Sequence, residues 1–254
     1  MNDQKNLKDM PLTPRLDSDS KQDYVRRGFD AIAPHYDIMN DLMTGGLHRR
    51  WKRETVRRLH LQPGMRVLDL CTGTGDLASR AFMDMRPDGM VAALDFSWQM
   101  MAAGRQRILH HANLSWISGN ASSLPFLENS FHGAMVGFGL RNVNSIETVL
   151  REVIRVLKPG ARFVSLDTAQ AEWQAIMPLF RFYMNRIVPW LGRFFADSRD
   201  MYAYLSTSAE AFETPQQLEA LFQQCGFVQT GYGYRPRILG GAGLVWGQKP
   251  GDLS

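Results

Sequence analysis

The sequence predicts an α/β fold organised around one open, mostly parallel sheet. Short apolar runs typical of strands buried on both faces alternate with stretches of helical periodicity along most of the chain. The run Val67–Leu70 leads through Gly73–Gly75 directly into a helix, and the next run ends in Asp95, twenty residues beyond Gly75. With 44% hydrophobic residues, the 254-residue chain can bury one substantial core. We therefore expect a single α/β domain with added segments.

A polar tail and a helical cap are expected before the first strand. Residues 1–20 predict a disordered tail, which leaves 21–254 as the domain. Residues 21–61 should cover the site with three helices, separated by Pro34 and Gly45-Gly46: Tyr24–Ile32, Tyr36–Met43 and Leu47–His60. The third helix is rich in arginine. A solvated basic face is its first interpretation, with contact to anionic lipid and then to nucleic acid as alternatives.

Four further apolar runs are expected to complete the sheet, and polar residues indicate where its helices begin. Ser97 and Asn144 are placed to cap the helices after the second and fourth strands, and Thr214 opens the last helix. The expected strands are Met90–Leu94, Leu114–Ile117, Ser130–Phe138 and Phe163–Leu166, with a closing strand pair within 227–248.

Residues 172–205 form an unusually aromatic segment between the fifth strand and the last helix. Large apolar side chains alternate there with arginines, and Pro178 and Pro189 interrupt any long helix. Such a segment cannot span a bilayer and favours an interfacial lid or an apolar substrate tunnel. A helical hairpin on the core is the alternative.

The turn after the first strand is expected to bind a nucleotide-like cofactor. Gly73, Gly75 and Ala78 satisfy the dinucleotide pattern G-x-G-x-x-A, in which a helix N-terminus holds a pyrophosphate. Asp69 and Asp76 would repel a pyrophosphate, whereas two acids suit a cationic ligand. S-adenosylmethionine carries an ammonium and a sulfonium but no phosphate, so we expect this cofactor rather than NAD. Alternatively, Asp69 only accepts from backbone amides and Asp76 only caps its helix.

The next two strand ends supply further expected cofactor contacts. Asp95, followed by Phe96, ends the second strand, where a carboxylate holds a ribose diol. Asn120, followed by Ala121, offers a donor and an acceptor to an adenine edge after the third strand. Asn120 as a simple turn residue is the alternative.

The loop after the fourth strand is expected to carry the reacting end of the site. In an open sheet this loop faces the ligand, so Arg141 and Asn142 should point at the reacting groups. An arginine stays protonated and cannot act as a base, which leaves it to stabilise a developing anion.

Composition indicates the compartment and excludes several classes of protein. The net charge of +4 allows contact with an anionic surface without requiring it, and Cys71 and Cys225 match no metal or disulfide pattern. No signal peptide or spanning helix is evident, so a cytoplasmic protein is expected, and a homo-oligomer is compatible with the sequence. No tyrosine has a lysine four residues on, as a short-chain dehydrogenase requires. The loop after the fourth strand is not of the N-P-P-Y kind and neither cysteine follows a proline, so the motifs of nucleic-acid methyltransferases are missing.

With these elements in place, the chain resembles the class I methyltransferases, and more narrowly the C-methyltransferases of ubiquinone and menaquinone biosynthesis. The resemblance covers roughly residues 24–248. It is most specific at Tyr36–Asn40, with His48 and Trp51 following, and at Gly139–Val143, followed by Arg155–Gly160. It implies a Rossmann-like, seven-stranded sheet with an antiparallel last strand. It also implies that Thr74, Asp95 and Asn120-Ala121 bind S-adenosylmethionine.

The resemblance implies C-methylation of a prenylated quinol by a peripheral membrane protein. Thr44, Gly137, Ala161 and Asp167 depart from the family pattern, and Leu94–Ser97 is closer to the naphthoquinone branch. Demethylmenaquinol, 2-phytyl-naphthoquinol and polyprenyl-benzoquinol remain as substrates. A methyltransferase for another small molecule, an NAD(P)-dependent oxidoreductase and a non-catalytic lipid-binding module are the other functions considered.

A base is needed to remove a ring hydroxyl proton from such a quinol. His35, Asp37 and His48 are the candidates that the cap supplies, the histidines because of their pKa. Each of them could instead be a structural hydrogen-bond partner.

Overall fold

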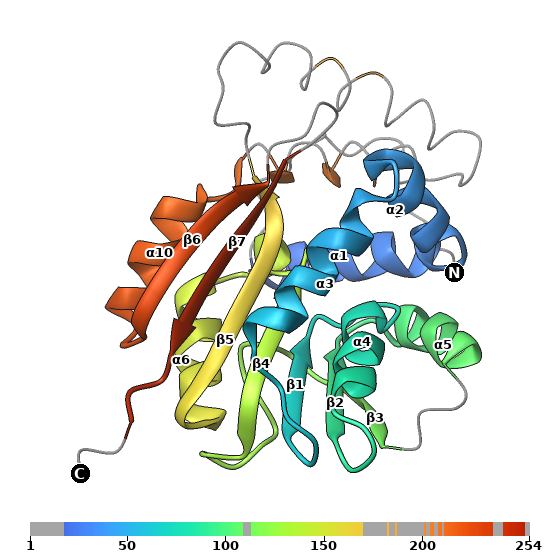
Figure 1. The fold of residues 1–254 in the computed structure, drawn as a ribbon. Helices are drawn as coiled ribbons and strands as arrows, with labels where there is room; N and C mark the ends of the chain where they lie inside the picture. The colour runs from blue at the N-terminus through green and yellow to red at the C-terminus, as the bar shows by residue number, and fades with distance from the viewer. Residues whose placement is uncertain are drawn as a thin grey trace.

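A seven-stranded sheet forms the centre of the molecule (Figure 1). Its strand order is β3-β2-β1-β4-β5-β7-β6, in which β1 to β5 are parallel and β7 runs antiparallel to both neighbours. The expected mostly parallel sheet of seven strands with an antiparallel last strand is therefore confirmed. The strands are β1 Arg66–Leu70, β2 Met90–Asp95, β3 Leu114–Ser118, β4 Phe131–Gly137, β5 Leu157–Ala169, β6 Val228–Arg235 and β7 Gly241–Gln248.

The computed structural model describes most of the sheet and its helices. The structure describes residues 18–108, 113–169, 211–235 and 241–251, together with Phe182, Arg186, Met201, Tyr204, Leu205, Ser208 and Ala209. Most of the expected 172–205 insertion and residues 1–17 of the expected tail therefore lie outside the described residues. The helices are α1 Ser18–Ile32, α2 Tyr36–Thr44, α3 Leu47–Arg58, α4 Asp76–Asp84, α5 Trp98–Arg107, α6 Ile146–Val156 and α10 Pro215–Gln224, with 3-10 turns η2 Ala33–His35 and η3 Leu140–Asn142.

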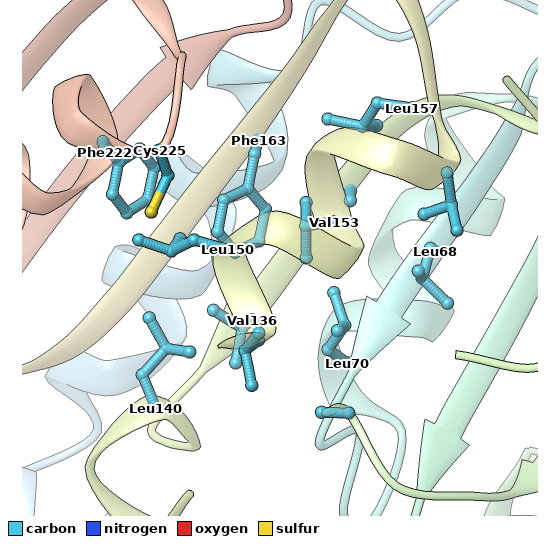
Figure 2. Close-up of a cluster of buried hydrophobic side chains, with 14 of the residues drawn as sticks. Leu68, Leu70, Val136, Leu140, Leu150, Val153, Leu157, Phe163, Phe222 and Cys225 are labelled. Carbon is cyan, nitrogen blue, oxygen red and sulfur yellow. The ribbon is translucent and has the colours of Figure 1, made fainter. Parts of the chain in front are cut away.

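Helices cover both faces of the sheet at its centre, which is why β1 and β4 are buried along most of their length. Leu68 points to the cluster beneath α6 and α10, drawn in Figure 2, whereas its neighbour Val67 points to the cluster beneath α3 and α4. Phe163 of β5 stacks on Phe222 of α10 with ring centroids 5.3 Å apart. Strands buried on both faces lose their period-two pattern, as the sequence indicated.

The helix starts agree with the sequence except at two positions. Ser97 accepts from the Met100 amide, and Thr214 forms a capping box with Gln217. Helix α6 is capped by Ser145, not by Asn144, because the Ser145 side chain accepts from the amide three residues on. The first helix begins at Ser18, within the segment that was expected to be a tail.

The cap lies over the carboxyl ends of the strands and has a small core of its own. Val25 and Ile32 of α1 and Met39 of α2 are fully buried there, together with Met201 and Leu205. None of the helices that the structure describes is long and apolar enough to span a bilayer.

Candidate active site

The turn after β1 is held from below by Asp69. Its buried carboxylate accepts from the Ala78 amide at 3.1 Å and from the Thr72 hydroxyl, while Oδ1 is buried without a hydrogen-bond partner. Burial raises the pKa of Asp69 to about 7. Asp69 lies under the turn and not on the cleft wall, so the structure agrees with the alternative that it accepts from a backbone amide.

The two glycines of the turn have different tasks. A Cβ on Gly75, which has a φ of +77°, would lie 2.4 Å from a Trp116 ring carbon, so this glycine permits the helix to pack on the sheet. Gly73 lies on the cleft wall, and its amide donates to Asp95. Thr74 and Gly75 do not line the cleft.

Asp95 is the buried carboxylate at the centre of the site. Its Oδ2 accepts from the Gly73 amide and its Oδ1 from the Ser97 amide, each at 2.8 Å. These bonds fix the carboxyl plane and leave further lone pairs for ligand hydroxyls. Burial raises the pKa of Asp95 to about 6, because desolvation outweighs the backbone amides that stabilise the anion. Side-chain position and chemistry both suit a ribose diol.

Asn120 and Ala121 enter the cleft from the loop after β3. The Asn120 side-chain oxygen accepts from the Ser122 amide at 2.9 Å, as in a polar turn, and its amide nitrogen is left to face a ligand. Asn120 therefore combines the turn role with a position on the cleft wall.

These strand ends enclose a single cleft at the point where the sheet changes winding direction. The space within it, with its open mouth included, is about 760 Å³. Between β1 and β4 the chain order reverses, which is where open sheets bind ligands. The lining residues are Gln22, Phe29, Tyr36, Cys71, Gly73, Leu94, Asp95, Phe96, Met100, Gly119, Asn120, Ala121, Gly137, Phe138, Gly139, Asn142 and Val143.

Two residues of this lining have a backbone conformation that side chains rarely adopt. Cys71 after β1 has a φ of +51°, and Phe138 after β4 has a φ of +59°. A Cβ on Gly139 would lie 2.5 Å from the Cys71 Cβ, so the two strand ends are in close contact. No local sequence signal predicted Cys71 or Phe138, since both positions depend on the contact between β1 and β4.

Arg141 and Asn142, expected side by side at the reacting end, point in different directions. Asn142 lines the cleft, where its Nδ2 donates to the Phe138 carbonyl at 3.3 Å. Arg141 does not line it: its guanidinium is buried in an ion pair with Asp167 at the end of β5. Its Nε is buried and has no hydrogen-bond partner. The expectation that both face the cleft is thus corrected for Arg141.

The three cap candidates for a base do not reach the cleft. His35 is exposed. His48 is buried in α3, where its Nε2 lies 2.8 Å from Asp41, and desolvation lowers its pKa. Asp37 accepts from the Thr74 hydroxyl at 2.8 Å and pairs with Arg107 at 2.6 Å. Asp37 therefore ties the cap to the cofactor turn, a role that its place in the sequence did not reveal.

The charge argument for the cofactor has to be revised at Asp76. Its carboxylate pairs at 2.9 Å with Lys52, a buried lysine of α3, so its charge is already compensated. Among the described residues that line the cleft, Asp95 is the one with a carboxylate. The lining fits S-adenosylmethionine through that carboxylate, the close backbone approach at Gly73 and the mostly apolar remainder.

Comparison with known proteins identifies the family. A sequence model of the ubiE/COQ5 methyltransferase family matches residues 17–246. The demethylmenaquinone methyltransferase of Lactiplantibacillus plantarum is 42% identical over 78% of this chain and 85% of that protein. That of Anoxybacillus flavithermus is 37% identical over 91% of this chain and 98% of that protein.

Solved structures share the fold at low sequence identity. A SAM-dependent methyltransferase from Thermotoga maritima has a TM-score of 0.61 at 16% identity, covering 89% of this chain and 99% of that one. One from Aquifex aeolicus has a TM-score of 0.58 at 15% identity, covering 84% and 97%. From the family match and its relatives, the chain belongs to the ubiE/COQ5 methyltransferase family.

Proposed function

We propose that this chain uses S-adenosylmethionine to methylate a ring carbon of a prenylated naphthoquinol of the demethylmenaquinol type. The observation that carries the proposal is the cleft lined by buried Asp95 and by Asn142, in a chain whose relatives are named demethylmenaquinone methyltransferases. A 2-phytyl-naphthoquinol and a polyprenyl-benzoquinol are the neighbouring candidates.

The cofactor contacts follow from the lining. Asp95 would hold the ribose hydroxyls, Gly73 would allow close backbone approach, and Phe96, Asn120 and Ala121 would enclose the adenine. Asp69, Thr74 and Gly75 shape the turn from outside the cleft. When bound, S-adenosylmethionine supplies an electrophilic methyl group on a sulfonium.

Asn142 is the residue that we assign to the quinol hydroxyl. Its amide is oriented by two contacts, since Nδ2 donates to Phe138 and Oδ1 accepts from the Tyr204 hydroxyl, 3.3 Å in both cases. One N–H and one lone pair remain for the substrate. Because the amide is already oriented, less entropy is lost when the substrate ring is positioned for attack.

Arg141 would act indirectly, because its ion pair with Asp167 holds the loop that places Asn142 on the cleft wall. The Arg141 guanidinium is buried outside the cleft, so it contacts Asp167 and not the substrate. In the reaction the ring hydroxyl gives its proton to solvent water, and the negative charge left on the oxygen is drawn into the ring as the ring carbon bonds to the methyl group; the same ring carbon then loses its hydrogen as a proton to water, which restores the aromatic ring. His35, Asp37 and His48 belong to the cap in this proposal and none acts as the base.

The prenyl tail of such a substrate stays in a bilayer, so we propose that the chain works as a peripheral protein on the cytoplasmic membrane surface. Residues 172–205 combine aromatic side chains with arginines, a composition suited to the interface.

Transfer of a labelled methyl group tests the proposal. The enzyme is incubated with labelled cofactor and a panel of reduced and oxidised benzo- and naphthoquinones. Label should enter the reduced naphthoquinol, because only the quinol has a ring carbon nucleophilic enough to attack. Equal transfer to the oxidised quinone under non-reducing conditions would contradict the mechanism, and transfer to a benzoquinol alone would change the substrate.

A further inference from the structure

The outer face of the cap is unusually basic. Every exposed residue of α3 is an arginine, namely Arg49, Arg50, Arg53 and Arg57, while its tryptophan, lysine and valine are buried. Arg49 pairs with Asp41. Arg50, Arg53 and Arg57 have no carboxylate of the described residues within ion-pair distance. They follow one another on one side of the helix and line a hollow on the surface.

The acidic residue of α3 does not neutralise this row. Glu54 borders the same hollow, but its carboxylate is already bound by Arg58 and by Arg235 of β6. Arg50, Arg53 and Arg57 are therefore exposed without an ion pair to any carboxylate of the described residues, although Arg53 also borders a second hollow that Asp76 and Asp84 line. At a rise of ~1.5 Å per residue, the three arginines lie within about 11 Å along the helix, so their charges repel one another. An anionic surface outside the protein would relieve this repulsion.

The preceding helix adds exposed apolar side chains to the same part of the molecule. Ile38 is 53% exposed and Leu42 is 42% exposed, and they are four residues apart on α2. Figure 1 shows that α2 and the beginning of α3 lie at the end of the molecule where the strands have their carboxyl ends, the end that holds the cleft. Arginines next to exposed aliphatic side chains are typical of surfaces that lie in a lipid interface.

We propose that Ile38 and Leu42 of α2, with Arg50, Arg53 and Arg57 of α3, form the surface that docks the protein on an anionic phospholipid bilayer. Positive charge complements the phosphates of such a bilayer, and the two aliphatic side chains enter its headgroup region. The inference rests on the proposed function in one respect, that a prenylated substrate is taken from a membrane. It places the bilayer against the cap, beside the cleft.

Vesicle binding of the full chain tests the surface. Sedimentation is measured with phosphatidylglycerol-containing vesicles and with phosphatidylcholine vesicles, at low and high salt. The R50Q/R53Q/R57Q variant should bind the anionic vesicles roughly a hundredfold more weakly, at about fivefold per arginine. The matched control R86Q/R105Q/R151Q removes the same charge from exposed positions on other parts of the chain and should bind as the wild type does.

Salt and the apolar pair separate the two contributions. High salt should abolish most of the difference between wild type and R50Q/R53Q/R57Q, because exposed charges are screened. I38S/L42S should weaken binding to the same extent at low and high salt. Wild-type binding by R50Q/R53Q/R57Q, or an equal loss in the control, would overturn the proposal. The oligomeric state is also measured without vesicles. If the wild type and the control self-associate and R50Q/R53Q/R57Q does not, the three arginines bind a second copy of the chain instead of a bilayer.

Failure of the surface and failure of the proposed function give different results. All variants are also assayed for methyl transfer to a short-tailed quinol in solution, where R50Q/R53Q/R57Q should be as active as wild type. On a long-tailed quinol embedded in anionic vesicles the same variant should be slower. If the wild type methylates no quinol while its vesicle binding depends on the three arginines, the proposed function fails and the docking surface stands.

Discussion

Replacement of Asp95 by alanine removes the carboxylate on which the proposed cofactor site depends. In the structure this carboxylate accepts two backbone amides, from Gly73 and Ser97, and faces the cleft. Hydrogen bonds from ribose hydroxyls to a charged acceptor contribute about 1.5 to 3 kcal/mol. Asp95→Ala should therefore weaken cofactor binding about tenfold to 150-fold, at ~1.4 kcal/mol per factor of ten.

The effect on stability is smaller than the number of lost bonds suggests. Two buried amides left without acceptors cost roughly 2 to 6 kcal/mol. Against this, the pKa of about 6 means that ionised Asp95 is disfavoured in the fold. Stability from Asp95 is fully present below its unfolded pKa of about 4 and is lost as pH rises through about 6, which amounts to ~3 kcal/mol at neutral pH. Alanine removes that penalty, so the two effects oppose each other.

Cofactor affinity is consequently the diagnostic measurement, by calorimetry on a variant shown to be folded by circular dichroism and denaturant unfolding. Asp88→Ala, an exposed acid just before β2, is the matched control and should bind as the wild type does. An Asp95→Ala variant that is folded and binds the cofactor with unchanged affinity would refute the assignment of Asp95.

Three further outcomes are expected. Cofactor affinity of the wild type should fall as pH decreases below about 6, because the ribose hydroxyls need ionised Asp95; a flat profile between pH 5 and 8 by calorimetry would argue against this. Arg141→Ala should lower the free energy of unfolding by about 3 to 5 kcal/mol, because it leaves Asp167 as a buried charge without its partner, whereas Arg141→Lys keeps a cation and should cost less; unchanged denaturant unfolding of Arg141→Ala would argue against the buried ion pair. Trp190→Ser with Phe194→Ser should reduce turnover of long-tailed quinols more than of short-tailed ones; identical losses would favour a role in the core.

The sequence predicted those parts of the site that follow from one strand and the turn after it. Asp95, Gly73 and Asn120 lie on the cleft wall because the carboxyl ends of parallel strands meet at one edge. The same rule located the loop of Asn142. Such positions depend only on local strand and turn patterns, which the residues themselves display.

Interactions between distant elements were not predictable in this way. The direction of Arg141 is decided by Asp167, 26 residues away on the neighbouring strand, and the charge of Asp76 by Lys52 on the cap helix α3. His48 similarly turns to Asp41 rather than to the cleft. Each of these pairs depends on how helices and strands meet in three dimensions, which hydrophobic periodicity does not specify.

The position of the transferred methyl group tests the central claim most directly. The enzyme is supplied with cofactor carrying a carbon-13 methyl group and with a reduced demethylmenaquinol analogue, and the product is examined by NMR. Our account predicts that the label is bonded to the ring carbon, with Asn142 orienting the ring hydroxyl. A label bonded to a ring oxygen, or no transfer to any quinol by a folded enzyme that binds the cofactor, would contradict it.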